Sequence, residues 1–326
     1  MPSNTPQLKV AAFLHQAWSI PLNSSLWQRD VSGTKLNGAD FPDPSIIEVD
    51  STWYAFATTS NNKLHIQVAS SPDFETWTLR SGYDALPYLP PWVDATAPNT
   101  WAPDVNQVDD GSFVMYYAAA TAEDSSKHCT GAATASQVTG PYMPNGNGPL
   151  ECAMDMGGAI DPSGFRDTDG TRYLTYKIDG NSIGHGGSCN NGIPPIIETP
   201  IMLQQLDADG ITKVGPARTI LVNQPADGPL IEAPSLTRAK SGEYVLFYSS
   251  NCYTSTQYDV AYAVADSITG PYTRVASLFQ STSGLVSPGG ADIDADGTHM
   301  LFHANVANGR GLFTAMIDID SGKVTA

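Results

Sequence analysis

The sequence lacks long apolar runs and has few basic residues. No window of about 18 consecutive apolar residues occurs, so we expect no transmembrane helix. Lysine and arginine together number 16, against 33 aspartate and glutamate residues, and the formal net charge is −17. Because nucleic acids and anionic membranes repel a negative surface, neither is an expected partner. Such a surface suits a neutral substrate.

Long helical patterns are also missing. No stretch of the 326 residues has the periodicity of a long amphipathic helix. The 29 glycines and 24 prolines are scattered, which indicates many turns rather than low complexity. Hydrophobic residues make up 41% of the chain, enough for a sizeable core. Since all-β folds of this length can form one unit, we predict a single all-β domain over residues 1–326.

Cysteine is scarce, with only Cys129, Cys152, Cys189 and Cys252. Their spacing matches no CxxC metal motif, and four cysteines allow three pairings. Cys129 and Cys152 flank one short predicted hairpin, so we pair them, which leaves Cys189 with Cys252. Buried free thiols in a reducing compartment are the alternative. Disulfides favour a secreted, extracellular protein, although residues 1–18 do not form a convincing signal peptide.

One sequence unit recurs five times. Each copy begins at or near an acidic residue and continues with a strand-like run, a polar turn and an aromatic run. The turns VDDG, DTDG, AKSG and DADG are typical of β-hairpins, because glycine readily adopts positive φ. The acidic residues that start the copies are Asp43, Asp104, Asp161, Glu232 and Asp292. Units of about four strands predict a five-bladed β-propeller. Tandem β-sandwiches, the alternative, would not explain acids at matched positions.

The propeller brings distant acids together. The first strand of each blade lines the central channel, so we expect Asp43, Asp161 and Glu232 to converge at one mouth of it. Carboxyl groups in one pocket repel one another, and their pKa values separate. Glycoside hydrolysis uses such a set, in which one carboxylic acid protonates the leaving oxygen and one carboxylate activates water or attacks the sugar.

Four motifs then point to a known family. FPDPSII, TWAPDV, IDPSGF and EAPSL, in this order, resemble glycoside hydrolase family 43, over about residues 41–319. The chain is similar to a fungal-type secreted member of its β-xylosidase, α-L-arabinofuranosidase and arabinanase group. The resemblance implies a five-bladed propeller and an inverting mechanism. We expect residues 1–38 to close the last blade. The resemblance also implies that Asp43 is the general base, Glu232 the general acid, and Asp161 the acid that tunes the pKa and orients the sugar.

Aromatic residues are the first candidates for binding the sugar. Trp101 in TWAPDV matches a family position that stacks on sugar, and an aromatic face suits the CH groups of a sugar ring. Packing in the core is the alternative for this residue. We expect Phe41 to wall the subsite of the reacting sugar and Trp92 to lie at the rim, unless Trp92 only packs its loop. We expect His185, in a glycine-rich loop, to border the mouth.

Arg310 and His303 are the remaining polar candidates. Arg310 resembles a family arginine, and we expect it to bind substrate hydroxyls and to hold Glu232 or Asp161. A surface arginine without such a role is the alternative. The resemblance suggests no required cofactor, but a structural calcium in the central channel, with His303 as its candidate ligand. A histidine satisfied within the core is the alternative. Arabinan-cleaving members tend to have PGH before the last blade, where this chain has SPGG with Gly290, which puts a metal site of that type in doubt.

These observations support three functions. The main hypothesis is an exo-acting glycosidase that releases terminal xylose or arabinofuranose from oligosaccharides or polysaccharides of plant cell walls. The alternative is an endo-α-1,5-L-arabinanase, against which the missing PGH argues mildly. A sugar-binding propeller without activity is the remote alternative, because all three acids are present. We expect a monomer.

Overall fold

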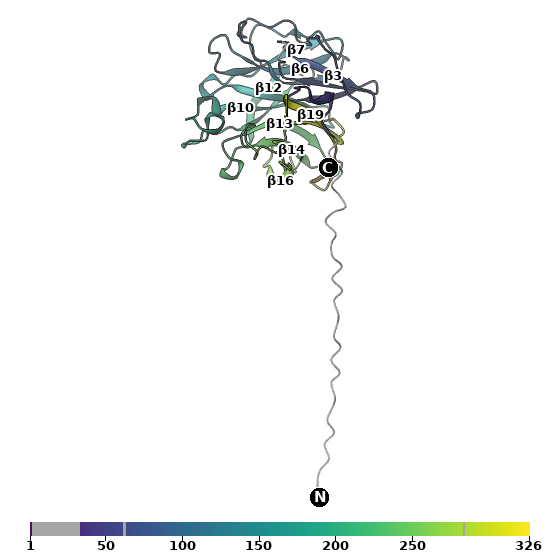
Figure 1. The fold of residues 1–326 in the computed structure, drawn as a ribbon, viewed down its shortest axis with the longest axis vertical. Helices are drawn as coiled ribbons and strands as arrows, with labels where there is room; N and C mark the ends of the chain where they lie inside the picture. The colour runs from purple at the N-terminus through teal and green to yellow at the C-terminus, as the bar shows by residue number, and fades with distance from the viewer. Residues whose placement is uncertain (2–32, 61–62, 283) are drawn as a thin grey trace.

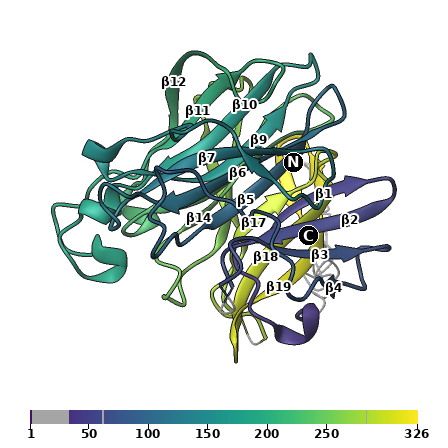
Figure 2. The ribbon, with the colours of Figure 1, turned by 90° about the horizontal axis from the view of Figure 1, so that it is seen from above.

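The computed structural model describes residues 1, 33–60, 63–282 and 284–326. The described chain forms five antiparallel blade sheets, four with four strands and one with three, and a separate two-stranded hairpin. Figures 1 and 2 show these strands from two directions. Its helices are single short 3₁₀ turns, and none of them, within these ranges, is long and apolar enough to cross a membrane. The prediction of a single-domain, all-β, five-bladed propeller is therefore confirmed.

The first four blades contain four strands each, and within a blade each strand pairs with its neighbours in chain order. Blade I consists of β1 (Ser45–Val49), β2 (Thr52–Ala57), β3 (Gln67–Ser71) and β4 (Thr78–Leu79). Blade II consists of β5 (Trp101–Gln107), β6 (Phe113–Ala120), β7 (His128–Ala135) and β8 (Met143–Pro144). Blade III consists of β9 (Ala159–Arg166), β10 (Arg172–Ile178), β11 (Ile201–Leu206) and β12 (Lys213–Leu221). Blade IV consists of β13 (Ile231–Arg238), β14 (Tyr244–Ser250), β15 (Val260–Ala265) and β16 (Thr273–Phe279).

The fifth blade is completed from the other end of the chain. Its sheet contains β17 (Gly289–Ile293), β18 (His299–Val306) and β19 (Gly309–Met316). Residues 35–41 run beside β19, because the amide of Lys35 donates to the carbonyl of Leu312 (2.7 Å) and that of Phe41 to the carbonyl of Arg310 (2.8 Å). The predicted closure by residues 1–38 involves this stretch, but residues 2–32 lie outside the described residues.

The remaining elements are short. The 3₁₀ turns are η1 (Leu36–Gly38), η2 (Met154–Met156), η3 (Gly180–Ile183), η4 (Ser188–Asn190) and η5 (Pro225–Asp227). A final hairpin of β20 (Asp318–Asp320) and β21 (Lys323–Thr325) packs near β16.

The inner strands form a closed ring. β1 contacts β5 and β17, β9 contacts β5 and β13, and β13 contacts β17. Figure 2 shows β1, β5, β9 and β17 near the middle of the molecule, with β4 and β12 toward its edge. The mouth of the channel is therefore built by the first residues of five strands that are far apart in sequence.

A strained residue recurs at this mouth in every blade. The backbone has positive φ at five equivalent positions, namely Asp43 (51°), Ala102 (43°), Asp161 (53°), Ala233 (51°) and Gly290 (56°). The ladders of β5, β9, β13 and β17 each shift register beside this residue, as at a β-bulge. Because residues with a side chain rarely adopt positive φ, the recurrence marks a site at which the fold sustains strain.

The bulges correct the predicted alignment of the acids. We expected Asp43, Asp104, Asp161, Glu232 and Asp292 to occupy matched positions. Only Asp43 and Asp161 match, because Glu232 comes one residue before the positive-φ residue of its blade. Asp104 and Asp292 come two residues after theirs. The extra residue of a bulge changes the direction of the side chains that follow it, which a comparison of sequence segments does not reveal.

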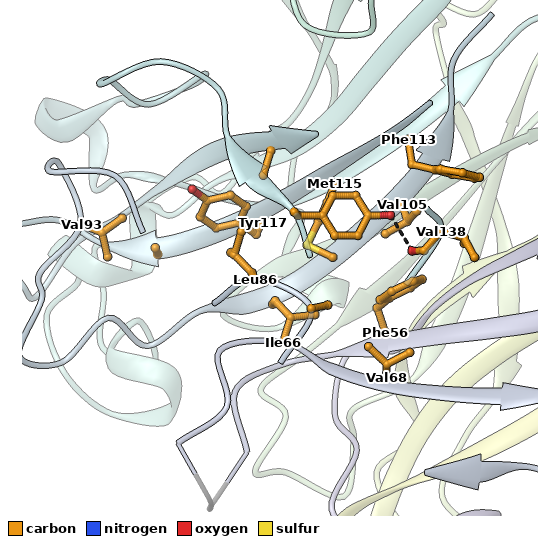
Figure 3. Close-up of a cluster of buried hydrophobic side chains, with 14 residues drawn as sticks. Phe56, Ile66, Val68, Leu86, Val93, Val105, Phe113, Met115, Tyr117 and Val138 are labelled. Carbon is orange, nitrogen blue, oxygen red and sulfur yellow. Dashed lines mark hydrogen bonds between the residues drawn. The ribbon is translucent and has the colours of Figure 1, made fainter. Parts of the chain in front are cut away.

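Apolar side chains fill the wedges between neighbouring blades. Figure 3 shows the cluster between blades I and II, where Phe56 and Val68 of blade I meet Val105, Phe113 and Met115 of blade II. All five side chains are buried, and burying one of this size stabilises the fold by about 1.5–3 kcal/mol. Packing of this kind holds the inner strands in place and so fixes the mouth of the channel.

Both predicted disulfides are present. Cys129 pairs with Cys152 (Cα–Cα 4.7 Å), and Cys189 pairs with Cys252 (Cα–Cα 5.5 Å). The second bridge joins the loop of η4, in blade III, to the loop that follows β14 in blade IV. It therefore ties together two segments that rise from neighbouring blades.

Candidate active site

The three predicted acids meet in one cavity of about 340 Å³ at the mouth of the channel. Asp43 precedes β1, Asp161 lies in β9 and Glu232 lies in β13, and all three line the cavity. The volume is within the usual range for sites that bind small molecules. The structure thus brings together carboxylates from blades I, III and IV, as the sequence predicts.

Asp43 is held as an anion. Its Oδ1 accepts a hydrogen bond from Nη1 of Arg310 (2.7 Å), and its Oδ2 accepts one from Oγ1 of Thr58 (2.7 Å). Burial acts to raise the pKa of Asp43, but the charge of Arg310 and these hydrogen bonds outweigh it, so the pKa is lowered. Asp43 is therefore an ionised carboxylate at neutral pH, which is the form that a general base needs.

His303 supports the same residue through its backbone. The amide of Asp43 donates to Nδ1 of His303 (3.1 Å), and the imidazole is fully buried. Burial and the nearby charge of Arg310 lower the pKa of His303 to about 3, so the ring is neutral. Gly290 makes room for it, because a Cβ there would lie 2.6 Å from Cε1 of the ring. The glycine that replaces the histidine of the PGH motif thus allows His303 to reach Asp43.

Asp161 lies beside Glu232 and holds a proton more tightly. Its Oδ2 accepts a hydrogen bond from the amide of Ala233 (2.9 Å). Burial raises the pKa of Asp161 to about 7, and the charge of Glu232 adds to the effect. A carboxyl group beside another carboxylate resists losing its proton, because the two negative charges repel each other. This side of the cavity can keep a proton at a pH where Asp43 has none.

Glu232 is fixed by two residues that the sequence analysis missed. Nζ of Lys177 donates to Oε2 of Glu232 (3.1 Å), and the hydroxyl of Tyr258 donates to Oε1 (2.8 Å). Nζ of Lys177 also lies 3.1 Å from Oδ1 of Asp179. A lysine inside the apolar strand run YLTYKI is the signal that could have revealed Lys177. No comparable signal marks Tyr258, which lies in a loop.

Of the three aromatic residues predicted to bind sugar, one lines the cavity and two do not. Trp101 lines the cavity and stacks on His128, with ring centroids 3.6 Å apart. Trp92 is packed against the core between blades I and II and does not line the cavity. Phe41 is fully buried in the core of blades I and V, so it supports the chain next to Asp43 rather than walling the subsite. His185 is exposed in its loop and does not line the cavity either.

Arg310 lines the cavity but holds a different acid from those predicted. Its ion pair is with Asp43, and no ion pair joins it to Glu232 or Asp161 in the described part of the chain. The guanidinium also lies 5.2 Å from the ring centroid of Tyr253, another lining residue. Arg310 contacts Asp43 because its strand, β19, lies in blade V and borders blade I, not blades III and IV.

Two further buried acids line the cavity and also join neighbouring blades. Asp104 of β5 accepts a hydrogen bond from the amide of Gly164 in blade III. Asp292 of β17 accepts the amide of Ile46 in blade I (2.9 Å) and the hydroxyl of Ser235 in blade IV (2.6 Å). Each carboxylate therefore joins the inner strands of different blades around the channel.

His303 is the candidate ligand for the predicted channel calcium. Calcium takes six to eight oxygen ligands. Within the described ranges, no three or more His, Cys, Asp and Glu side chains form a group that could hold a metal ion. Nδ1 of His303 already accepts the amide of Asp43, which leaves only its buried Nε2 without a protein partner. The channel calcium therefore stays an expectation that rests on His303 alone, and no step below uses a metal.

Known proteins share this sequence pattern and fold. The family model described as "Glycosyl hydrolases family 43" matches residues 37–318. The extracellular endo-alpha-(1->5)-L-arabinanase 1 of Bacillus subtilis (strain 168) is 26% identical over 290 residues, which cover 85% of this chain and 83% of that protein.

A second relative and a solved structure agree with this match. The extracellular endo-alpha-(1->5)-L-arabinanase of Thermotoga petrophila is 28% identical over 211 residues, covering 51% of this chain and 43% of that enzyme. The structure of the GH43 endo-arabinanase from Bacillus licheniformis superposes with a TM-score of 0.71 at 25% identity, covering 90% of this chain and 99% of that one. With the family model spanning most of the chain and three acids converging in its cavity, the chain belongs to glycosyl hydrolase family 43.

Proposed function

We propose that this protein hydrolyses α-1,5-linked arabinan internally, with inversion at the anomeric carbon. The observation that carries the proposal is the contrast within one cavity between the lowered pKa of Asp43 and the raised pKa of Asp161, which lies beside Glu232. An inverting glycosidase needs one carboxylate and one carboxylic acid on opposite faces of the sugar. The names of the Bacillus and Thermotoga relatives support arabinan as the substrate and endo cleavage as the mode.

The residues divide the reaction between them. Asp43 removes a proton from a water molecule, whose oxygen attacks the anomeric carbon. The bond between this carbon and the glycosidic oxygen breaks, and Glu232 gives its proton to the departing oxygen. Asp161 retains negative charge or a proton according to the state of Glu232, and so keeps the acid protonated until it is needed. Trp101 offers an aromatic face to a neighbouring sugar ring.

Exo cleavage is the second candidate, and it was the main expectation from sequence. One observation favours it, because Cys189 lines the cavity and ties its loop to the loop after β14 through Cys252. Two tied loops at the rim could block one end of a groove. Release of terminal arabinofuranose or xylose would then replace internal cleavage. The relatives' names support the endo alternative more strongly.

Early products distinguish the two modes. Linear α-1,5-arabinan, xylan and short oligosaccharides of both sugars are incubated with the enzyme, and products are separated by chromatography during the first few per cent of conversion. We expect a ladder of arabino-oligosaccharides. Monosaccharide alone from the outset would overturn endo cleavage, and products from xylan alone would overturn the choice of substrate.

Proton NMR of the first product tests the stereochemistry. The α-linked substrate should yield the β-anomer before mutarotation, and initial α-anomer would exclude the roles given to Asp43 and Glu232. We also propose that the protein is extracellular and monomeric. The two disulfides and the extracellular relatives support the first point.

A further inference from the structure

We propose that Lys177 is a positioning residue which, balanced by Asp179, fixes Glu232 and sets the upper pH limit of activity. This inference rests on the hydrolase function proposed above. Lys177 lies in β10, the second strand of blade III, and its side chain is fully buried. It lines the cavity and lies 3.1 Å from Glu232 and 3.1 Å from Asp179.

The placement of Lys177 is energetically demanding unless it is paired. Moving an ammonium group out of water carries a penalty of several kcal/mol, and close carboxylates must offset it. Burial acts to lower the pKa of Lys177, but the charges of Glu232, Asp179 and Asp161 outweigh it and raise the pKa. Lys177 therefore remains a cation whose hydrogen bond holds Oε2 of Glu232 at one point.

The same cation influences the proton of the acid pair. Burial and the charge of Glu232 raise the pKa of Asp161, whereas Lys177 acts in the opposite direction. Asp179 lies 3.1 Å from the same ammonium, and its charge partly cancels that of Lys177. The charged and titratable groups that face Glu232 or share its cavity are Lys177, Asp179, Asp161, Tyr258, Tyr253, Asp43, Arg310, Asp104 and Asp292. Of these, Lys177 is the cation in direct contact with Glu232.

Two substitutions should therefore move the pH profile in opposite directions. Lys177→Met removes the cation with little change in length, so the acid pair keeps its proton to higher pH. Asp179→Asn removes the anion that neutralises Lys177, so the pair loses its proton at lower pH. A charged neighbour at this distance typically shifts a pKa by about one to three units. A residue that only packed the strand would not produce shifts of opposite sign.

The test measures kcat and kcat/KM on linear α-1,5-arabinan across the pH range for the wild type and both variants. We expect the alkaline limb of the pH profile to move to higher pH by about one unit or more in Lys177→Met, and to lower pH in Asp179→Asn. Since Glu232 loses its anchor, kcat of Lys177→Met at its own optimum should fall by about 10–100-fold. Lys213→Met is the matched control, because Lys213 is exposed on β12 and pairs with Glu151 away from the cavity. Its profile should equal that of the wild type.

A measurement without substrate separates this inference from the proposed function. Carboxyl ¹³C NMR should show the titration of Asp161 moving up in Lys177→Met and down in Asp179→Asn. Unchanged limbs and titrations, or shifts of the same sign, would overturn the role of Lys177. If Lys177→Met fails to fold, Asp179→Asn decides alone, because it changes no volume. A wild type inactive on arabinan with both NMR shifts present would overturn the proposed substrate and leave the electrostatic role standing.

Discussion

The base side and the acid side of the cavity hold their carboxylates with similar donors. Asp43 accepts one hydrogen bond from a cation, Arg310, and one from a hydroxyl, that of Thr58. Glu232 likewise accepts one from Lys177 and one from the hydroxyl of Tyr258. The direct donors therefore do not explain why one side is ionised while the other keeps a proton.

The difference lies in how many acids share each cation. Among the described residues, Arg310 has one carboxylate within ion-pair distance, that of Asp43, and the charge of Asp40 also acts on it. Lys177 has two, Glu232 and Asp179, and the charge of Asp161 also acts on it. An acid side with three carboxylates and one cation favours binding a proton more than a base side with two carboxylates and one cation. The balance of charge around each pair sets the two chemical roles.

The largest effects on activity are expected when the carboxylates of Glu232 and Asp43 are removed one at a time. Glu232→Gln should lower kcat on arabinan by about 10²–10⁴-fold, because the leaving oxygen is no longer protonated. Asp43→Asn should cause a loss of similar size, because water is no longer activated. The comparison is sharpened with an aryl arabino-oligosaccharide whose phenolate leaves without a proton.

On the activated substrate the two variants should differ. Glu232→Gln should recover much of its activity, whereas Asp43→Asn should stay inactive. Circular dichroism should show that both variants are folded. Equal recovery, or none in either variant, would contradict the division into an acid side and a base side.

Asp161→Asn tests the crowding of the acid side through stability. The folded chain keeps a proton on Asp161 up to a pKa of about 7, whereas the unfolded chain releases it near ~3.9. The stability that Asp161 contributes therefore falls as pH rises from ~4 to about 7. The amide does not titrate, so at pH ~7 the free energy of unfolding of the variant should exceed that of the wild type by on the order of 1–4 kcal/mol.

Urea unfolding at two pH values measures this difference. The gain should vanish near pH ~4, where Asp161 is protonated in both states. The kcat of Asp161→Asn should be about 10²-fold lower than that of the wild type, because Glu232 loses its partner. A variant less stable than the wild type at neutral pH would show that the acid side is not strained by excess charge.

Sequence predicts the blades better than it predicts their exact register. The run FVMYYAAA forms β6 and the run YVLFYSS forms β14, because aromatic and β-branched residues between glycine turns specify strands strongly. The bulges at the channel mouth were not predictable. They displace Asp104 and Asp292 from the positions expected of them, and no local residue type signals them apart from the proline that follows in four blades.

The acids of the site were predictable, whereas their partners mostly were not. Asp43, Asp161 and Glu232 were found because each lies in a short motif that repeats along the chain. Their partners Arg310 and Tyr258 are distant in sequence and reach them only after the ring closes. A contact of this kind depends on the relative rotation of two blades, which hydrophobic patterns do not encode. For this reason the sequence predicts Arg310 as a site residue, whereas its acidic partner is Asp43 and not the predicted Glu232 or Asp161.

The smallest effect is expected from weakening the base side. Arg310→Met removes the cation that opposes burial, so the pKa of Asp43 should rise. Because a general base must be ionised, the acidic limb of the pH profile should move up by about one to two units, while the alkaline limb stays in place. At its optimum the variant should retain about a tenth of the wild-type kcat.

Thr58→Val provides the graded comparison on the same side. It removes one neutral hydrogen bond to Asp43 and no charge, so the acidic limb should move in the same direction by a smaller amount. A shift confined to the acidic limb in both variants would show that the two sides titrate independently. Movement of the alkaline limb would instead mean that the charge of Arg310 also reaches Glu232, and the two sides would then have to be treated as one coupled system.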